Sequence, residues 1–341
     1  MAATSIQPSK SLVMLPQHNT DALNIPHLDV NVLTALPDFD SVAGVSYCGM
    51  SAWAKTYKIT IVNTGGGQAE FFMKVSTGYH GREALKGEYI STMTIHTAVP
   101  SFCPKPLAWG TFDSDPEAHF YVCKFYYFYQ GLPDPESFCE KLARLHGTES
   151  PNGKFGFECT TYNGSLPQDN TWHDSWERFF VNGLHHVLRL REERGGPEPE
   201  LDAVLPPLFE KVIPRLLGPL EREGRKVKPV LVHGDLWCGN ASIIDENSRE
   251  GIIYDGASFF AHNEYELGNW RSELNMFTKE YFEAYQRQIP ISEPREDFDD
   301  RNALYALRFN LHAATLFPNQ HSYVETAIGE IKRLGKKFAN D

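Results

Sequence analysis

The sequence lacks the features that mark a membrane protein, a disulfide-stapled protein or a zinc protein. Its six cysteines form no C-x-x-C pair and no Cys/His cluster, so a reducing compartment is expected. No stretch approaches the roughly 18 apolar residues of a membrane-spanning helix. The N-terminus has no basic segment followed by an apolar one, as a secretory signal would. We therefore expect a cytoplasmic protein with no membrane partner.

The sequence also has fewer basic residues than acidic ones. The chain has 32 Lys and Arg against 44 Asp and Glu, which gives a formal net charge of −12. Nucleic acids and anionic lipids are bound by clustered Lys and Arg, so neither is expected as a partner. Apolar residues make up 41% of the 341 residues, enough for one large or two modest domains.

The pattern of apolar residues divides the chain into a leader and two regions. Residues 1–28 are polar and interrupted by prolines, and they read as a flexible leader. Residues 29–126 are rich in β-branched and aromatic runs. After a short helix over 29–36, this region predicts four strands and one further helix, over residues 56–62, 70–76, 81–99 (the helix), 107–112 and 119–126.

Residues 127–341 are mainly helical in pattern, with three short β-like segments in their middle. Helices are predicted over 135–146, 172–194, 201–217, 264–288 and from 297 onward, and β-like segments over 229–233, 242–245 and 251–254. The whole chain is thus predicted to be an α+β protein, with a β-rich N-terminal lobe and a mainly helical C-terminal lobe.

The most informative stretch is VHGDLWCGN, residues 232–240. It places Asp235 after a β-like run and Asn240 five residues later, the spacing of the kinase catalytic loop H-R-D-x-x-x-x-N. An acceptor hydroxyl needs a carboxylate that orients it and takes its proton, and we assign this role to Asp235. Asn240 would supply an oxygen to Mg²⁺, which favours hard oxygen ligands.

A second carboxylate follows at kinase spacing. The apolar run over residues 252–254 leads into Asp255, which corresponds in order to the metal-binding Asp of the kinase D-F-G segment. Taken singly, HGD is also an ordinary loop cap and Asp-Gly an ordinary hairpin turn. Their joint order and spacing favour one site for Mg²⁺ and ATP in a protein-kinase-like two-lobed fold.

Lys74 is the single charge in the otherwise apolar run FFMKV. A buried ammonium is costly unless it is paired, and Glu88 on the following predicted helix can pair with it, with Glu83 as the alternative. In a kinase site this lysine contacts the α- and β-phosphates. The other interpretation is an edge-strand lysine whose ammonium reaches solvent.

Two further segments would complete a nucleotide site. Residues 46–51, ending at Ser51, stand just before the first predicted strand, where a loop over the phosphates would lie. Cys48 in this loop is either a redox-sensitive thiol or an inert, partly buried one. Lys124 and Phe125 would form the hinge between the two regions and offer backbone groups to adenine.

These strings resemble the fructosamine-3-kinase and ketosamine-3-kinase family, relatives of the aminoglycoside phosphotransferases. The resemblance rests on HGDLWCGN, on IIYDGASFFAHNEYEL, on FGFECTTYNGSLPQDNTWHDSWERFF and on KLARLHG and EAYQRQIP, and it spans residue 29 to the C-terminus. Cys238 and Gly256 depart from the family's common Ser and Pro. The resemblance implies phosphorylation of the 3-hydroxyl of a ketosamine on lysine or a free amine, followed by spontaneous release of the amine.

Residues for the sugar side are named with alternatives. His262, Glu264 and Glu266 follow Asp255 closely and are candidates to bind sugar hydroxyls or the ketosamine nitrogen; the alternative is a helix start with Asn263 and Glu266 as a capping box. Trp237 would either stack on the sugar or anchor the catalytic loop in the core. Asn170 and Trp172 are pocket candidates through the resemblance alone.

Two other functions use the same motifs. A phosphotransferase for an aminoglycoside, choline or a similar alcohol would share the catalytic set, and a catalytically silent pseudokinase would keep the fold. The second alternative usually leaves one key position replaced, whereas Lys74, Glu88, Asp235, Asn240 and Asp255 are all present. The sequence leaves open which ketosamine sugar is used, and it allows a monomer or a homodimer.

Overall fold

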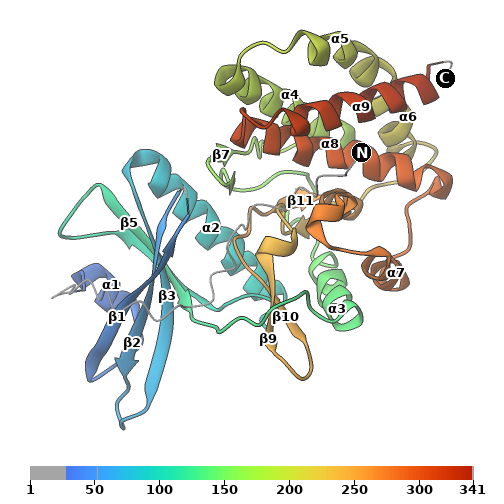
Figure 1. Cartoon of the computed structure of the whole chain (residues 1–341). Helices are drawn as coiled ribbons and strands as arrows, with labels where there is room; N and C mark the ends of the chain where they lie inside the picture. Colours follow the sequence, from blue (N-terminus) through green and yellow to red (C-terminus); the bar gives the residue numbers. More distant parts are fainter. Residues whose placement is uncertain (1–27, 52, 340–341) are drawn as a thin grey trace, which may run out of the picture.

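The computed structural model describes residues 28–51 and 53–339. The predicted leader falls outside these ranges apart from Leu28. A strongly twisted antiparallel sheet lies on one side of the molecule and a larger helical region on the other, with α2 (Gly78–Ala98) reaching from the first toward the second (Figure 1). The predicted α+β class with a β-rich N-terminal region is confirmed.

The sheet has five strands in the order β1-β2-β3-β5-β4. Strand β5, which lies between β3 and β4, is buried on both faces, and the alternation of its side chains explains why. Tyr121 and Cys123 pack against Leu85 of α2, whereas Phe120 and Val122 face Val32 of α1. The bounds are α1 Val30–Ala35, β1 Ser41–Met50, β2 Lys55–Val62, β3 Gln68–Thr77, β4 Pro106–Thr111 and β5 Ala118–Lys124.

The first strand was not predicted. Residues 46–51 were expected as a loop, but β1 pairs with β2 from Ser41↔Val62 to Met50↔Lys55, which leaves only a tight turn between them. β1 is an edge strand, mostly exposed and interrupted by two register shifts. Such a strand lacks the apolar alternation by which strands are found in a sequence.

The helical region surrounds one large apolar core in which Trp176 contacts the rings of Phe155, Phe179 and Tyr305. α4, α8 and α9 lie side by side at the far end from the sheet (Figure 1). The bounds are α3 Pro135–Leu145, β6 Tyr162–Asn163, β7 Leu166–Pro167, α4 Trp176–Gly195, α5 Pro199–Pro207, α6 Ile213–Leu217, β8 Val230–Val232, β9 Ala241–Asp245, β10 Glu250–Ile253, β11 Phe259–Ala261, α7 Lys279–Gln288, α8 Phe298–Leu316 and α9 His321–Lys337.

Two predicted helices differ from the structure. The helix expected over 264–288 is a buried 3₁₀ helix, Asn263–Arg271, followed by irregular chain and α7. The helix expected over 201–217 changes to a π-turn at Leu208–Val212, directly after Pro206 and Pro207. Proline has no N–H to donate, so the regular ladder cannot pass through this segment.

α2 is docked on the helical region by close backbone contact. A Cβ on Gly87 would lie 2.6 Å from the carbonyl oxygen of Thr160, so only glycine permits this approach. Four residues later, the Oγ of Ser91 accepts a hydrogen bond of 3.0 Å from the N–H of Ser258. Among the described residues, no helix is long and apolar enough to cross a membrane.

Candidate active site

The candidate catalytic loop runs from the end of β8 to the start of β9. Gly234 turns the chain there with φ of +84°, and a Cβ at this position would lie 2.2 Å from the carbonyl oxygen of Ala257. A glycine is therefore required for the loop to lie against the segment between Asp255 and β11. β8 itself pairs with β11, so the loop is fixed to the core on one side.

Asp235 is held by the end of the same loop. The Nδ2 of Asn240 donates to the Asp235 carbonyl oxygen at 2.8 Å and to its Oδ2 at 3.1 Å. Burial raises the pKa of Asp235 to about 8, and the nearby carboxylates of Asp255 and Glu266 act in the same direction. A carboxylate with a raised pKa is a better proton acceptor than an ordinary one, which suits a general base.

Asp255 follows β10 and has a left-handed backbone, with φ of +59°. Non-glycine residues adopt this conformation rarely, and such residues concentrate at functional sites. Its Oδ1 lies 2.6 Å from the Nζ of Lys74 on β3, and its side chain is 46% exposed. The carboxylate thus contacts the sheet through Lys74 and is also accessible to solvent.

Lys74 also contacts Glu88 of α2, with Nζ 2.8 and 2.9 Å from the two carboxylate oxygens. The pair that was expected from the sequence is therefore present, and Glu83 is not the partner. Burial works against the ammonium, but Asp255 and Glu88 together raise the pKa of Lys74 above its ordinary value. One cation thus joins the sheet, α2 and the segment after β10.

Ser51 lies in the turn between β1 and β2. Its Oγ accepts hydrogen bonds from the N–H groups of Trp53 and Ala54, at 3.2 and 3.0 Å, so the side chain shapes the turn. Cys48 lies in β1 rather than in a loop, and burial raises the pKa of its thiol. A raised pKa lowers the thiolate fraction near neutral pH, which favours the inert interpretation of Cys48 over the redox-sensitive one.

The segment that joins the two regions begins at the end of β5. The N–H of Lys124 donates to the carbonyl oxygen of Lys105 at 2.9 Å, and the N–H of Phe125 donates to that of Glu70 at 3.1 Å. Both predicted hinge donors are thus used within the sheet.

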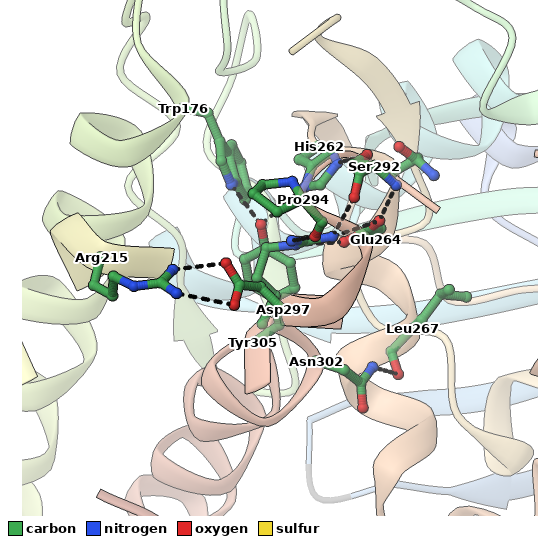
Figure 2. A network of polar contacts seen from close by, with 12 residues as sticks. Trp176, Arg215, His262, Glu264, Leu267, Ser292, Pro294, Asp297, Asn302 and Tyr305 are labelled. Atoms are coloured by element: carbon green, nitrogen blue, oxygen red, sulfur yellow. Dashed lines mark hydrogen bonds and ion pairs between the residues drawn. The ribbon is translucent and has the colours of Figure 1, made fainter. Parts of the chain in front are cut away.

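His262, Glu264 and Glu266 are 2%, 2% and 0% exposed, and their contacts favour structural roles over sugar binding. Figure 2 shows His262 between Tyr305 and Ser292, with both contacts at 2.9 Å. Glu264 accepts from Arg301 at 2.9 Å and from the N–H of Ser292 at 2.8 Å.

Glu266 reaches back under the catalytic loop. Its carboxylate accepts from the N–H of His233 at 2.5 Å and from that of Gly234 at 3.1 Å, and its Oε2 lies 3.6 Å from the Nε2 of His146. The alternative of a capping box is wrong, because Asn263 lies inside the 3₁₀ helix and no side chain caps its start. Glu266 holds the catalytic loop instead.

Trp237 folds back over its own loop. A Cβ on Gly239 would lie 2.4 Å from the Trp237 ring, so the glycine makes room for the indole. The ring is half-buried next to Asp235, and it remains a candidate to stack on a sugar. Trp172 stacks on Phe260 at 6.2 Å and belongs to the edge of the core.

Asn170 is 7% exposed, and its amide donates to the carbonyl oxygen of Cys159 and to Thr161. Among the described residues its Oδ1 has no hydrogen-bond partner, and Asn170 lines a cavity of about 20 Å³ between α4 and α8. This volume holds about one water molecule. The contacts of its amide with Cys159 and Thr161 therefore give Asn170 a structural role beside this small cavity.

With this geometry in place, comparison with known proteins decides the family. A family model for "Fructosamine kinase" matches residues 52–337. The chain belongs to the fructosamine kinase family. Fructosamine kinases transfer phosphate to a hydroxyl acceptor, so the enzyme class predicted from the sequence is confirmed.

Similar proteins agree with this fructosamine kinase assignment. An Arabidopsis thaliana protein named "Protein-ribulosamine 3-kinase, chloroplastic" is 26% identical over 316 residues, covering 86% of this chain and 90% of its own length. A solved structure of a Thermobifida fusca protein assigned as a fructosamine-3-kinase has a TM-score of 0.67 at 22% identity, over 87% of this chain and 94% of its own.

The aminoglycoside phosphotransferase APH(4)-Ia, in a ternary complex with AMP-PNP and hygromycin B, has a TM-score of 0.56 at 15% identity, covering 87% of this chain and 95% of its own. This likeness shows the kinase-like fold. The family resemblance predicted from HGDLWCGN and the other quoted segments is thus confirmed over residues 52–337.

One residue of this fructosamine kinase that lies near Asp235 was not predicted from the sequence. Asn163 in β6 is 4% exposed, and its Nδ2 donates to the carbonyl oxygen of Gly234 at 3.2 Å. Asn163-Gly164 is a strong hairpin signal, and it could have been recognised. Its place beside the catalytic loop depends on contacts far apart in the sequence.

Proposed function

We propose that the chain uses ATP and Mg²⁺ to phosphorylate the 3-hydroxyl of ketosamines, sugars that have glycated a lysine or a free amine. The observation that carries this proposal is the meeting of Asp235, Asn240, Asp255 and the Lys74–Glu88 pair at one place between the sheet and the helical region. In this proposal residues 29–126 form the nucleotide-binding lobe and residues 127–341 the catalytic and substrate lobe.

Asp235 is proposed as the general base. Its carboxylate takes the proton of the acceptor hydroxyl while the sugar oxygen bonds to the γ-phosphorus of ATP, and the bond from that phosphorus to the bridging oxygen of ADP breaks. The raised pKa of Asp235 suits it to accept that proton. The proton returns to solvent when the products leave.

Asn240 and Asp255 are proposed as the protein ligands of Mg²⁺. The amide nitrogen of Asn240 is used by Asp235, which leaves its Oδ1 as an oxygen donor, and the Asp255 carboxylate is half exposed. The described residues contain no group of three or more His, Cys, Asp or Glu that could hold a metal by themselves. This donor set fits Mg²⁺, which is usually held by one or two carboxylates together with phosphate oxygens. When bound, Mg²⁺ neutralises charge on those oxygens.

Lys74 is proposed to contact the α- and β-phosphates, and Glu88 keeps its ammonium in place. The β1–β2 turn at Ser51 would cover the phosphates, and the chain after Lys124 and Phe125 would meet adenine. On the acceptor side Trp237 is the proposed stacking surface, with Asn170 and Trp172 supporting the pocket from behind.

The ketosamine acceptor is preferred over an aminoglycoside or choline because the family model covers both the catalytic loop and the acceptor side of the chain. The phosphorylated adduct would decompose and release the amine, so the biological role would be protein deglycation. A cytoplasmic location and a monomer or homodimer stay predictions.

An acceptor panel tests the proposal. Purified protein is given Mg-ATP with ribulose-lysine, fructose-lysine, choline or an aminoglycoside, and ADP release and product mass are followed, with Asp235→Asn as the control. We expect transfer to one or both ketosamines and none with the variant. Transfer to choline or the aminoglycoside alone would replace the proposed acceptor, and no transfer to any acceptor would favour a pseudokinase.

A further inference from the structure

The short hairpin of β6 and β7 touches the catalytic loop through Asn163. The amide of this buried residue donates to the carbonyl oxygen of Gly234, the residue before the base, at 3.2 Å. The Asn163 side chain is also near enough to the Asp235 carboxylate to lower the pKa of Asp235, against the larger effect of burial. Asn240 contacts the same carboxylate, so two amides from different parts of the chain hold the base.

The backbone of Asn163 is fixed by α8. The Nε2 of His312 lies 3.0 Å from the Asn163 carbonyl oxygen, and the NH1 of Arg308 lies 3.2 Å from the Nδ1 of His312. Burial and the Arg308 charge lower the pKa of His312 to about 3, so the imidazole is neutral. A guanidinium can only donate, which places the imidazole proton on Nε2, where it is donated to Asn163.

Two parts of the N-terminal region, the β1–β2 turn and α2, contact the tip of the β6–β7 hairpin. Gly164 has φ of +55°, and a Cβ on it would lie 3.1 Å from the ring of Trp53, which belongs to the β1–β2 turn. The Nε2 of His80 on α2 lies 2.8 Å from the carbonyl oxygen of Ser165. The His80 ring also packs edge-to-face on Tyr162, with centroids 5.0 Å apart.

We propose that the β6–β7 hairpin is a positioning element for the base, in which Asn163 fixes the Gly234–Asp235 turn and Trp53 transmits the position of the β1–β2 turn to Asn163. The inference rests on the proposed function, because it gives Asp235 the role of base. It adds that the turn over the phosphates and the base are mechanically connected through one hairpin. Asn163 is thus a positioning residue, not a catalytic one.

The first test needs no turnover. Native-state hydrogen exchange reports local opening of the backbone, and the amides of His233 and Gly234 are hydrogen-bonded to Glu266 in the catalytic loop. Asn163→Ala removes the hydrogen bond to the carbonyl oxygen of Gly234. We expect exchange at residues 233–236 to become about tenfold faster, beyond any change caused by lower global stability.

Asn302→Ala is the matched control. Asn302 is 3% exposed and its Nδ2 donates to the carbonyl oxygen of Leu267 at 2.8 Å, so it is also a buried amide bonded to backbone. This variant should lose stability without a local increase in exchange at residues 233–236. Equal exchange at residues 233–236 in the two variants, compared at equal global stability, would overturn the role of Asn163.

The connection to Trp53 is tested by a double-mutant cycle on kcat. Asn163→Ala and Trp53→Ala should each lower kcat about tenfold, and the double variant should lose less than the product of the two, because both act through one hairpin. Multiplicative losses would overturn the connection. Failure of the unmodified protein to phosphorylate any acceptor would instead contradict the proposed function, and the exchange rates at residues 233–236 would still decide the role of Asn163.

Discussion

The ammonium of Lys74 lies 2.6 Å from the carboxylate of Asp255, although the two residues are 181 positions apart in the chain. The same ammonium binds Glu88 on α2. This contact joins the proposed phosphate-binding lysine to the proposed metal ligand. A substitution of either residue therefore leaves the other without its opposite charge.

Lys74→Met should cripple the use of ATP, because it removes the proposed phosphate contact and leaves Glu88 buried without its cation. We expect kcat/KM for ATP to fall on the order of 100-fold, the typical loss when one preorganised donor is removed. Lys141→Met is the control, since Lys141 on α3 is about as buried as Lys74 and also pairs with a glutamate, Glu250, but has no role in the proposed site. Equal ATP kinetics in the two variants would remove Lys74 from the site.

Asp235→Asn should abolish most phosphoryl transfer and leave Mg-ATP binding largely intact. The amide keeps the shape of the side chain but cannot take a proton. Isothermal titration with Mg-AMP-PNP measures binding, and ADP release with a ketosamine measures transfer. An active variant would show that another group accepts the proton.

The pH dependence follows from the raised pKa of Asp235. Asp235 must be ionised to act as a base, and its pKa in the free protein is raised to about 8. The value of kcat/KM should therefore rise with pH up to about 8 and level off above it. A profile that is already flat at pH 6 would mean that the rate does not depend on this ionisation.

Glu264 and Glu266 lie two positions apart in the 3₁₀ helix, but their substitution should have different effects. Glu264→Gln breaks a pair with Arg301, which is fully buried, so stability should fall by about 3–5 kcal/mol while KM for the ketosamine stays unchanged. Unfolding curves and acceptor kinetics on the folded protein measure the two effects. A large rise in KM alone would return Glu264 to the sugar site.

Glu266→Gln should lower kcat as well as stability, because Gln has one oxygen in place of the two that accept from His233 and Gly234. Its KM for the ketosamine should change little. A stability loss with kcat unchanged would show that the catalytic loop keeps its shape without this carboxylate.

The sequence was most informative where chemistry forces a residue type. Asp235, Asn240 and Asp255 were predicted from their spacing, and the Lys74–Glu88 contact from the cost of a lone charge in an apolar strand. Each of these signals is local or follows from a simple rule of burial. The five-stranded sheet was predicted except for β1, whose exposed edge has weak alternation.

The acceptor side was harder to predict because its polar residues form hydrogen bonds with other residues of the protein. His262, Glu264 and Glu266 were expected near the sugar, but each is buried against partners 28 or more positions away, such as Ser292 and Arg301. Asn163 was missed for the same reason. Contacts between segments so far apart leave no periodicity or spacing in the sequence.

The most direct test of the central claim is the position of the transferred phosphate. Ribulose-lysine and fructose-lysine are incubated with the protein and Mg-ATP, and phosphorus–proton NMR assigns the phosphate while free lysine is followed over time. We predict phosphate on O3 and release of lysine after phosphorylation, with neither in Asp235→Asn. Phosphate on another hydroxyl, or a stable product that releases no amine, would contradict the assignment of this chain as a deglycating ketosamine 3-kinase.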